Sequence, residues 1–148
     1  FDLATKKGGN LFIHGRIDDV INIRGHRIGS EEIESVIHKI KEIYECCAIS
    51  ISDDIEGHVI YLFVVSQEKN LDDKIFNNIV SSFGTYALPK KIYYVQELPK
   101  TRSGKILRRL LRSILINPNL IKSKDLTMML NKKVIKDINK KILTDVKN

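Results

Sequence analysis

Several residue types are scarce in this sequence, and their scarcity excludes whole classes of protein. The chain has no tryptophan and only two cysteines, Cys46 and Cys47, in 148 residues. Adjacent cysteines suit neither a disulfide framework nor a metal-binding knuckle, so we expect reduced thiols in a cytoplasmic or nuclear compartment. The longest strongly apolar run, VIYLFVV, is too short to cross a bilayer, which predicts no membrane partner. Because the chain begins with Phe1 rather than Met, we expect it to be a fragment of a longer protein.

Positive charge predominates. Lysine and arginine number 25 against 18 aspartates and glutamates, which gives a formal charge of +7. This excess favours anionic partners: nucleic acid, an acidic membrane surface or phosphorylated small molecules. Hydrophobic residues make up 43% of the chain, which is enough for the core of one domain. Composition alone does not choose among the three kinds of partner.

Apolar spacing in the first forty residues predicts strands followed by a helix. GGNLFIHG indicates a turn and a short strand, and DDVINIRG indicates a second strand that ends at Gly25, so together they predict a small hairpin. A helix is predicted from about Ser30, which is placed to cap it ahead of acidic residues in the first turn. Its apolar face comprises Ile33, Val36, Ile37 and Ile40.

The middle of the chain predicts a sheet and a second helix. CCAISIS and HVIYLFVVS are rich in strand formers and are separated by a polar loop, so we expect an antiparallel pair with Cys46 and Cys47 pointing to opposite faces. LDDKIFNNIVSSFG has helical periodicity and ends at Gly84, and KIYYVQ predicts another short strand. These elements indicate an α+β fold in which a small β-hairpin leads into a compact sheet flanked by helices.

The segment LPKTRSGKILRR combines a loop with the start of a predicted helix. Lys105 falls at or near the first turn, close to the natural caps Thr101 and Ser103, where the helix dipole disfavours a cation. At about 100° per residue, one helical face carries a basic stripe. The stripe comprises Lys105, Arg108, Arg109 and Arg112. It is either a solvated face, which periodicity favours, or a surface for phosphates, which the unusual position of Lys105 favours.

Two segments together resemble a known family. GRIDDVINIRGHRIGSEEIE and LPKTRSGKILRR are similar, in this order, to the two signature segments of the C-terminal domain of adenylate-forming, AMP-binding enzymes. The residues of both segments resemble those of acetyl-CoA synthetases and short-chain relatives, including propionyl-CoA synthetases. The similarity runs from about Phe1 to about Ile116. It implies a connection to an N-terminal domain at 1–17 and a catalytic lid at 18–116. The tail at 117–148 lies beyond the resemblance; its composition and the weak helical spacing of its apolar residues predict a basic, helical segment, either a docking helix or a loosely attached appendage.

The resemblance implies a two-step ligase reaction. A carboxylate attacks ATP, which is bound with Mg²⁺, to give an acyl-adenylate and diphosphate; CoA then displaces AMP to give the thioester. Between the steps the lid would rotate over its partner, the enzyme's own N-terminal adenylation domain. Lys105 matches the family's catalytic lysine, which stabilises negative charge as the adenylate forms. A lysine acetyltransferase and a deacetylase acting on Lys105 would switch this step off and on.

The same resemblance implies roles for residues of the first segment. Asp18 matches the hinge about which the lid rotates. The positions implied to bind ATP or AMP are Asp2, Arg16 and Arg27. The positions implied to bind CoA are Arg24, Gly25 and His26. Gly25 permits close backbone approach, whereas Arg24 replaces the small residue that is expected there.

Two departures from the family pattern bear on particular sites. Val80, Ser81 and Ser82 precede Gly84 where a basic residue often grips CoA, so we expect an altered CoA grip. Bacterial relatives also bind a cation through a histidine and two carbonyl groups, and here isoleucine occupies the histidine position. We therefore expect this metal site to be weakened or absent. The corresponding positions are His38, Ile40 and Ile43.

The residues leave alternative functions open. A propionyl-CoA synthetase or an adenylating enzyme that loads a carrier protein would share both segments, because the acyl pocket belongs to another domain. A basic nucleic-acid-binding module would use Arg108, Arg109 and Arg112, but the stripe lacks interleaved aromatic residues and no zinc or RNP-type motif accompanies it. Because the sequence contains no glycine-rich phosphate-binding loop, we expect the chain alone to be inactive.

Overall fold

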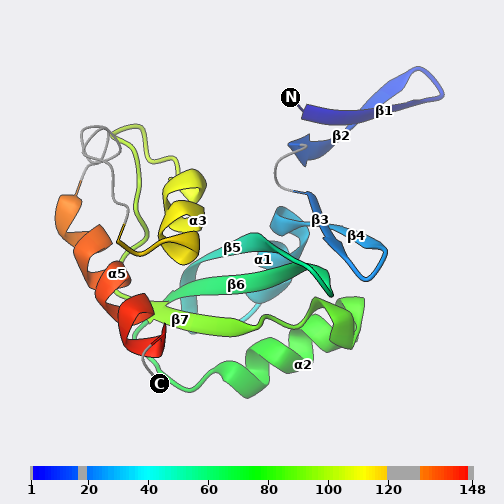
Figure 1. The fold of residues 1–148 in the computed structure, drawn as a ribbon. Helices are drawn as coiled ribbons and strands as arrows, with labels where there is room; N and C mark the ends of the chain where they lie inside the picture. The colour runs from blue at the N-terminus through cyan, green and yellow to red at the C-terminus, as the bar shows by residue number, and fades with distance from the viewer. Residues whose placement is uncertain (1, 17–19, 120–130, 147–148) are drawn as a thin grey trace.

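The computed structural model describes residues 2–16, 20–119 and 131–146. Figure 1 shows two β-hairpins followed by a three-stranded sheet with helices packed against it. Among the described residues, no helix has the length and apolar character needed to cross a bilayer. The architecture confirms the predicted α+β fold, in which strands lead into a compact sheet flanked by helices.

Two hairpins open the chain, and their pairing differs from the prediction. The strands are β1 (Asp2–Lys7), β2 (Asn10–Arg16), β3 (Val20–Ile23) and β4 (His26–Gly29). β1 pairs with β2 and β3 with β4, both antiparallel, so the expected hairpin between β2 and β3 is wrong. The reason is local: Gly8 and Gly9 both adopt positive φ and close a two-residue turn that pairs β2 with the strand before it.

The central sheet has the strand order β5, β6, β7. β5 (Ile43–Asp53) and β6 (Gly57–Ser66) are antiparallel, as predicted, and β7 (Lys91–Val95) runs parallel to β6. A parallel pair needs a crossover, which α2 (Asp72–Phe83) and the short 3-10 helix η2 (Thr85–Ala87) provide. Gly84 follows α2 with a φ of +98°, which confirms the expected helix end. One consequence of this order is that β5 lies at an edge of the sheet.

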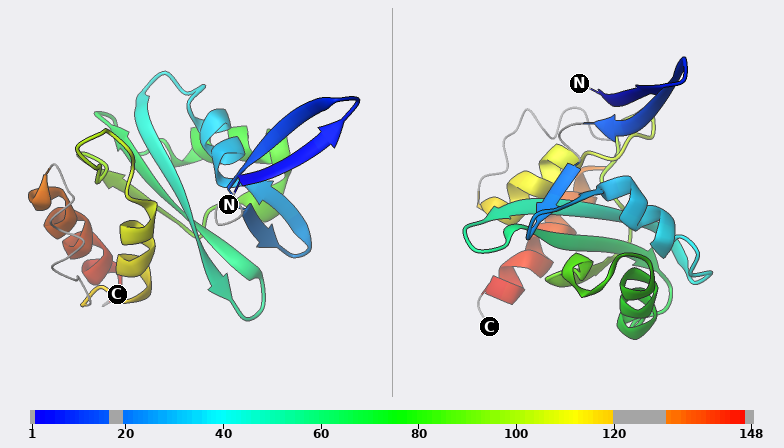
Figure 2. Two further views of the ribbon diagram at one scale, coloured as in Figure 1. Left: turned by 90° about the horizontal axis from the view of Figure 1, so that it is seen from above. Right: turned by 90° about the vertical axis from the view of Figure 1, so that its right-hand side faces the viewer.

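Two hydrophobic cores lie on opposite faces of the sheet. Strand alternation sends Cys46 and Ala48 of β5 into one core and Cys47 and Ile49 into the other, as predicted for the cysteines. Both thiols are free and buried, and burial raises the pKa of Cys46 well above its usual range. Figure 2 shows helices on both sides of the sheet. α1 (Ser30–Ile37) and α2 pack in the first core, and α3 (Arg108–Ile116) and α5 (Lys132–Val146) pack in the second.

The C-terminal tail contains a docking helix rather than a loose appendage. Apolar residues spaced three and four apart on α5 are buried in the second core. They are Val134, Ile135, Ile138 and Ile142. The weak helical periodicity of this segment therefore reflects a face packed against the sheet.

The start of α1 differs from the prediction in one respect. Ser30 is the first helical residue and is buried, so it does not cap the helix. Gly29 occupies the cap position, and its N–H donates to the Glu32 carboxylate at 3.0 Å. The acidic first turn was predicted correctly, but one of its members provides the capping contact.

Candidate functional site

Lys105 lies in a closed turn ahead of α3, not in the first turn of that helix. α3 begins at Arg108 with Leu107 at its cap position, and no side chain caps it. The expectation that Thr101 or Ser103 would cap this helix is therefore wrong. The preceding residues form a narrow bridge, in which Lys100 pairs with Ile106, instead of continuing the helix backward.

Hydrogen bonds close this segment, residues 99–107, which we call the Lys105 turn. The N–H of Thr101 donates to the carbonyl of Lys105 at 2.8 Å, and the N–H of Leu107 donates to that of Pro99 at 2.8 Å. The Thr101 hydroxyl accepts the Lys105 N–H at 3.1 Å, which explains why it is not a helix cap. Gly104 has a φ of +82°, a conformation that side chains with a Cβ rarely adopt. The backbone around Lys105 is therefore held from both sides.

The Lys105 side chain is exposed at the surface of this turn. Within residues 2–16, 20–119 and 131–146, its ammonium group makes no ion pair or hydrogen bond. Lys100, at the base of the same turn, instead forms an ion pair with Glu45 of β5. Of these two lysines, Lys105 is the one available to an anionic ligand.

Two of the four residues in the predicted basic stripe contact β5, at the open edge of the sheet. Arg108 donates to Glu34 through both terminal nitrogens, at 2.5 Å from Nη1 to Oε1 and 2.8 Å from Nη2 to Oε2. Glu34 also accepts the N–H of Ala48 at 2.8 Å, and Arg112 donates to the carbonyl of Ser50 at 3.1 Å. Unpaired backbone groups of an edge strand need such partners. Two arginines of the stripe are therefore structural, which weakens the case for a nucleic-acid-binding surface.

The turn between β3 and β4 has an unusual backbone. Arg24 and Gly25 both adopt positive φ, +48° and +84°, as the favoured two-residue hairpin turn requires. The N–H of Arg24 donates to the carbonyl of Glu56 at 3.0 Å, and its guanidinium binds both carboxylate oxygens of Glu56. This pairing raises the pKa of Arg24 and lowers that of Glu56. The sequence alone did not indicate this partner for Arg24.

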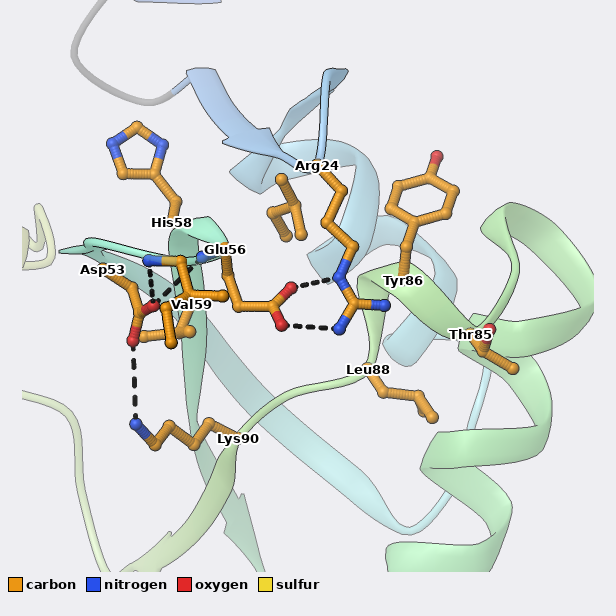
Figure 3. A pocket seen from close by; sticks show the side chains of 11 residues that line it. Arg24, Asp53, Glu56, His58, Val59, Thr85, Tyr86, Leu88 and Lys90 are labelled. Carbon is orange, nitrogen blue, oxygen red and sulfur yellow. Dashed lines mark hydrogen bonds and ion pairs between the residues drawn. The ribbon is translucent and has the colours of Figure 1, made fainter.

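Arg24 lines a surface cavity of about 420 Å³ (Figure 3). Tyr86 lines the same cavity, and its ring stacks on that of His26 with centroids 4.1 Å apart. On the other side, Asp53 accepts the N–H groups of Ile55 and Glu56, each at 3.0 Å, which lowers the Asp53 pKa. The cavity therefore combines a stacked aromatic wall with charges that are already paired.

Other residues of the predicted CoA and nucleotide sites lie on different elements. Arg27 is exposed on β4, and the backbones of Asp2 and Arg16 are register partners in the pairing of β1 with β2. Asp18, the predicted hinge, lies outside the described residues. The three residues that replace the expected CoA grip lie in the last turns of α2 and are exposed. They are Val80, Ser81 and Ser82.

The three positions considered for a metal make other contacts. His38 Nδ1 lies 2.8 Å from the Glu34 carbonyl oxygen, and the side chains of Ile40 and Ile43 are buried in the first core. The N–H of Ile43 donates to the Ile40 carbonyl at 3.0 Å and closes the turn between α1 and β5. Where the chain is described, no three His, Cys, Asp or Glu side chains cluster as metal ligands would. The weakened metal site remains a prediction.

The two predicted groups of site residues do not converge. In Figure 1 the turn between β3 and β4 lies to the right of the sheet, whereas the segment leading into α3 lies to the left. Glu34, Glu56 and Tyr86 were missed as members of these regions. Only Glu34 carried a signal, because it is the third acid of the EEIE run and lies three residues before the apolar Ile37, on the side of the helix that can face inward.

Comparisons with known proteins match most of the chain to one family. Residues 32–105 match the family described as "AMP-binding enzyme C-terminal domain". Acetyl-coenzyme A synthetase 2 of Candida albicans is 39% identical over 121 residues, 77% of this chain and 18% of the relative. Acetyl-coenzyme A synthetase of Helicobacter pylori is 39% identical over 141 residues, 89% of this chain and 21% of the relative. The chain thus spans about a fifth of the length of these curated relatives.

Solved structures have the same fold. An acyl-CoA synthetase of Brucella canis superposes with a TM-score of 0.64 at 30% identity, over 80% of this chain and 23% of that one. A fatty acyl CoA synthetase of Mycobacterium tuberculosis superposes with a TM-score of 0.63 at 30% identity, over 76% of this chain and 23% of that one. Both similarities cover most of this chain and about a quarter of the larger protein.

Proposed function

The chain belongs to the family of AMP-binding enzyme C-terminal domains, and from this premise we propose that it is the catalytic lid of an ATP-dependent acetyl-CoA synthetase. We call the longer protein, with its N-terminal adenylation domain, the complete enzyme. In the first step a carboxylate oxygen attacks the α-phosphorus of ATP and diphosphate leaves. In the second step the CoA sulfur attacks the acyl carbon of the adenylate and AMP leaves.

The observation that carries the proposal is the Lys105 turn. Lys105 is the last residue of the family match, and it presents an exposed ammonium group on a backbone closed by hydrogen bonds. A cation fixed where negative charge develops lowers the barrier, because it needs no reorganisation as the reaction proceeds. Lys105 would stabilise the charge on the carboxylate and the α-phosphate as they react. Mg²⁺ would accompany ATP.

The second step would use the cavity beside the turn between β3 and β4. Gly25 has positive φ and no atoms within 4 Å of an added Cβ, so its backbone is open to a ligand. The ring of His26 is held by Tyr86, and Arg24 offers a guanidinium to a phosphate of CoA. Asp2, Arg16 and Arg27 would contact the nucleotide, and rotation about Asp18 would exchange the two regions.

The separation of the two regions supports rotation of the lid. In Figure 1 the segment that leads into α3 lies to the left of the sheet and the β3–β4 turn lies to its right, so one orientation against the adenylation domain would not bring both regions to the same substrate. Acetylation of Lys105 would remove its charge and block only the first step. The exposure of the side chain makes it accessible to an acetyltransferase and a deacetylase.

The test is carboxylate-dependent exchange of labelled diphosphate into ATP by the complete enzyme. We expect exchange with acetate, and a loss of at least about a hundredfold in Lys105→Ala because a group that stabilises developing charge is removed. Lys39→Ala is the control, since Lys39 is also exposed. Stronger exchange with propionate would assign a propionyl-CoA synthetase. Exchange that survives in Lys105→Ala, or is absent from the folded complete enzyme, would contradict the proposal.

A further inference from the structure

The structure contains a buried ion pair just beyond the Lys105 turn that the proposed mechanism does not use. We propose that Glu34 and Arg108 are positioning residues, which hold the Lys105 turn in the geometry needed for adenylate formation. This inference rests on the function proposed above. Neither side chain is required to touch the substrate; both act through Lys105.

The contacts of the pair fix its position tightly. The side chains of Arg108 and Glu34 are only 21% and 11% exposed, and two parallel hydrogen bonds join them. Arg108 also donates to the sulfur of Cys47 at 3.0 Å, and Glu34 accepts the Ala48 N–H. A bidentate arrangement restricts orientation as well as distance. The pair thereby joins α1, α3 and the edge of β5.

The Lys105 turn is connected directly to this pair. Arg108 is the first residue of α3, and Leu107, directly before it, is bonded to Pro99 across the base of the turn. The other side of the base is attached to β5 through the ion pair of Lys100 with Glu45. Ile106 and Leu107 also pack against the second core. Loss of the Arg108 contact would release one of the two charged attachments, so the turn would sample more orientations.

Adenylate formation is sensitive to such a loss, because electrostatic stabilisation depends on preorganised geometry. A misplacement of about 1 Å can reduce a rate by about a hundredfold. The second step should be far less affected, because the cavity at Arg24 and Gly25 is built from the β3–β4 turn, the β5–β6 turn and η2. A purely structural pair would instead impair both steps together.

The test compares both half-reactions in the complete enzyme. Acetate-dependent diphosphate exchange measures adenylation, and thioester formation from synthetic acetyl-adenylate and CoA measures the second step. The variants are Arg108→Met, Arg108→Lys and Glu34→Gln. Arg109→Met is the matched control, because it removes the same charge from the next, exposed residue of α3. Thermal midpoints are recorded for every variant.

We expect Arg108→Met and Glu34→Gln to lower kcat for exchange by about tenfold to a hundredfold, with KM for acetate and ATP nearly unchanged. Thioester formation should stay within about twofold of the unsubstituted enzyme. A double variant that combines Glu34→Gln with Arg108→Met should lose little more kcat than Arg108→Met alone, because the two residues act as a unit. Arg108→Lys should recover part of kcat, and Arg109→Met should match the unsubstituted enzyme.

Three results would overturn the inference. Equal losses in both half-reactions would make the pair merely structural, and unchanged exchange in Glu34→Gln and Arg108→Lys would remove any role in positioning. Glu34→Gln is nearly isosteric and Arg108→Lys keeps the positive charge, so these two variants decide the question even when Arg108→Met does not fold. Absence of exchange in the unsubstituted enzyme would overturn the proposed function, and this inference with it.

Discussion

The β3–β4 turn and the start of α3 each contain an arginine bound to both oxygens of a glutamate, but in different surroundings. The side chains of Arg24 and Glu56 are 63% and 28% exposed, whereas those of Arg108 and Glu34 are 21% and 11% exposed. Solvent screens the first pair and competes with it, so it can open to a ligand. The second pair is largely shielded from water and is held by neighbouring donors and acceptors, so removing Arg108 leaves the Glu34 carboxylate buried without its cation.

The difference shows why a count of basic residues is a poor guide to function. Arg108 and Arg112 looked like part of a surface stripe but satisfy the edge of β5. Arg24 was predicted only as a CoA-binding position in a turn, and in the structure it lines a cavity where it is paired with Glu56. What an arginine does is decided by its neighbours in space, which can lie far away along the chain.

The largest expected effect on stability is at the less exposed pair, Arg108 with Glu34. Arg108→Met should lower the free energy of unfolding of this chain by about 3 kcal/mol, because Glu34 would remain buried without its cation. Urea unfolding measures the loss. The control Arg109→Met should change the free energy of unfolding by less than about 0.5 kcal/mol. Similar values for the two variants would show that the buried pair contributes no more than a surface charge.

A smaller effect is expected at the turn that carries Arg24. Gly25→Ala should lower the free energy of unfolding by about 1 kcal/mol, because alanine is strained at a φ of +84° although space for its Cβ is available. Gly25→Asn should lose less, since asparagine tolerates this conformation. Urea unfolding of both variants measures the difference. An alanine variant as stable as the asparagine variant would show that the turn relaxes freely.

The exposed pair should affect ligand binding more than stability. In the complete enzyme, Glu56→Gln should lower KM for CoA about twofold, because the carboxylate no longer competes with phosphate for Arg24. Acetate-dependent diphosphate exchange should not change. Glu68→Gln, at an exposed residue beyond β6, is the control. An increase in KM for CoA would mean instead that Glu56 holds Arg24 in its binding position.

The smallest effect concerns pH at the β5–β6 turn. The pKa of Asp53 is lowered by the N–H groups of Glu56 and Ile55, and that of Glu56 by Arg24. A lowered pKa in the folded state means that the stabilisation is present above the unfolded pKa, about 4 for both carboxyl groups, and is lost as pH falls through the folded value. The Ile55 amide resonance should follow this titration. In Asp53→Asn the pH response of the Ile55 resonance should disappear. A response that persists would mean that a group other than Asp53 causes it.

Local patterns allowed much of the fold to be predicted. The β5–β6 pair, α2 with its end at Gly84, and the opposite faces of Cys46 and Cys47 follow from alternation, helical periodicity and glycine. The pairing of β2 was wrong because two strands competed for it and the Gly8 and Gly9 turn decided. The cap of α1 was wrong because Gly29 occupies the cap position one residue before Ser30, and the Glu32 carboxylate accepts the Gly29 N–H.

By itself, the sequence determined the family, through two short segments that contain Lys105. It also determined the glycines that permit the turns at Gly25 and Gly104. These properties depend on residue identity and on backbone freedom within a few positions. Only the tertiary structure decided that Arg108 meets Glu34 and that Arg24 meets Glu56, across 74 and 32 positions of chain. The first contact depends on how α1 and α3 pack at the edge of β5, and the second on how closely the β3–β4 and β5–β6 turns approach each other. No local sequence pattern encodes either geometry.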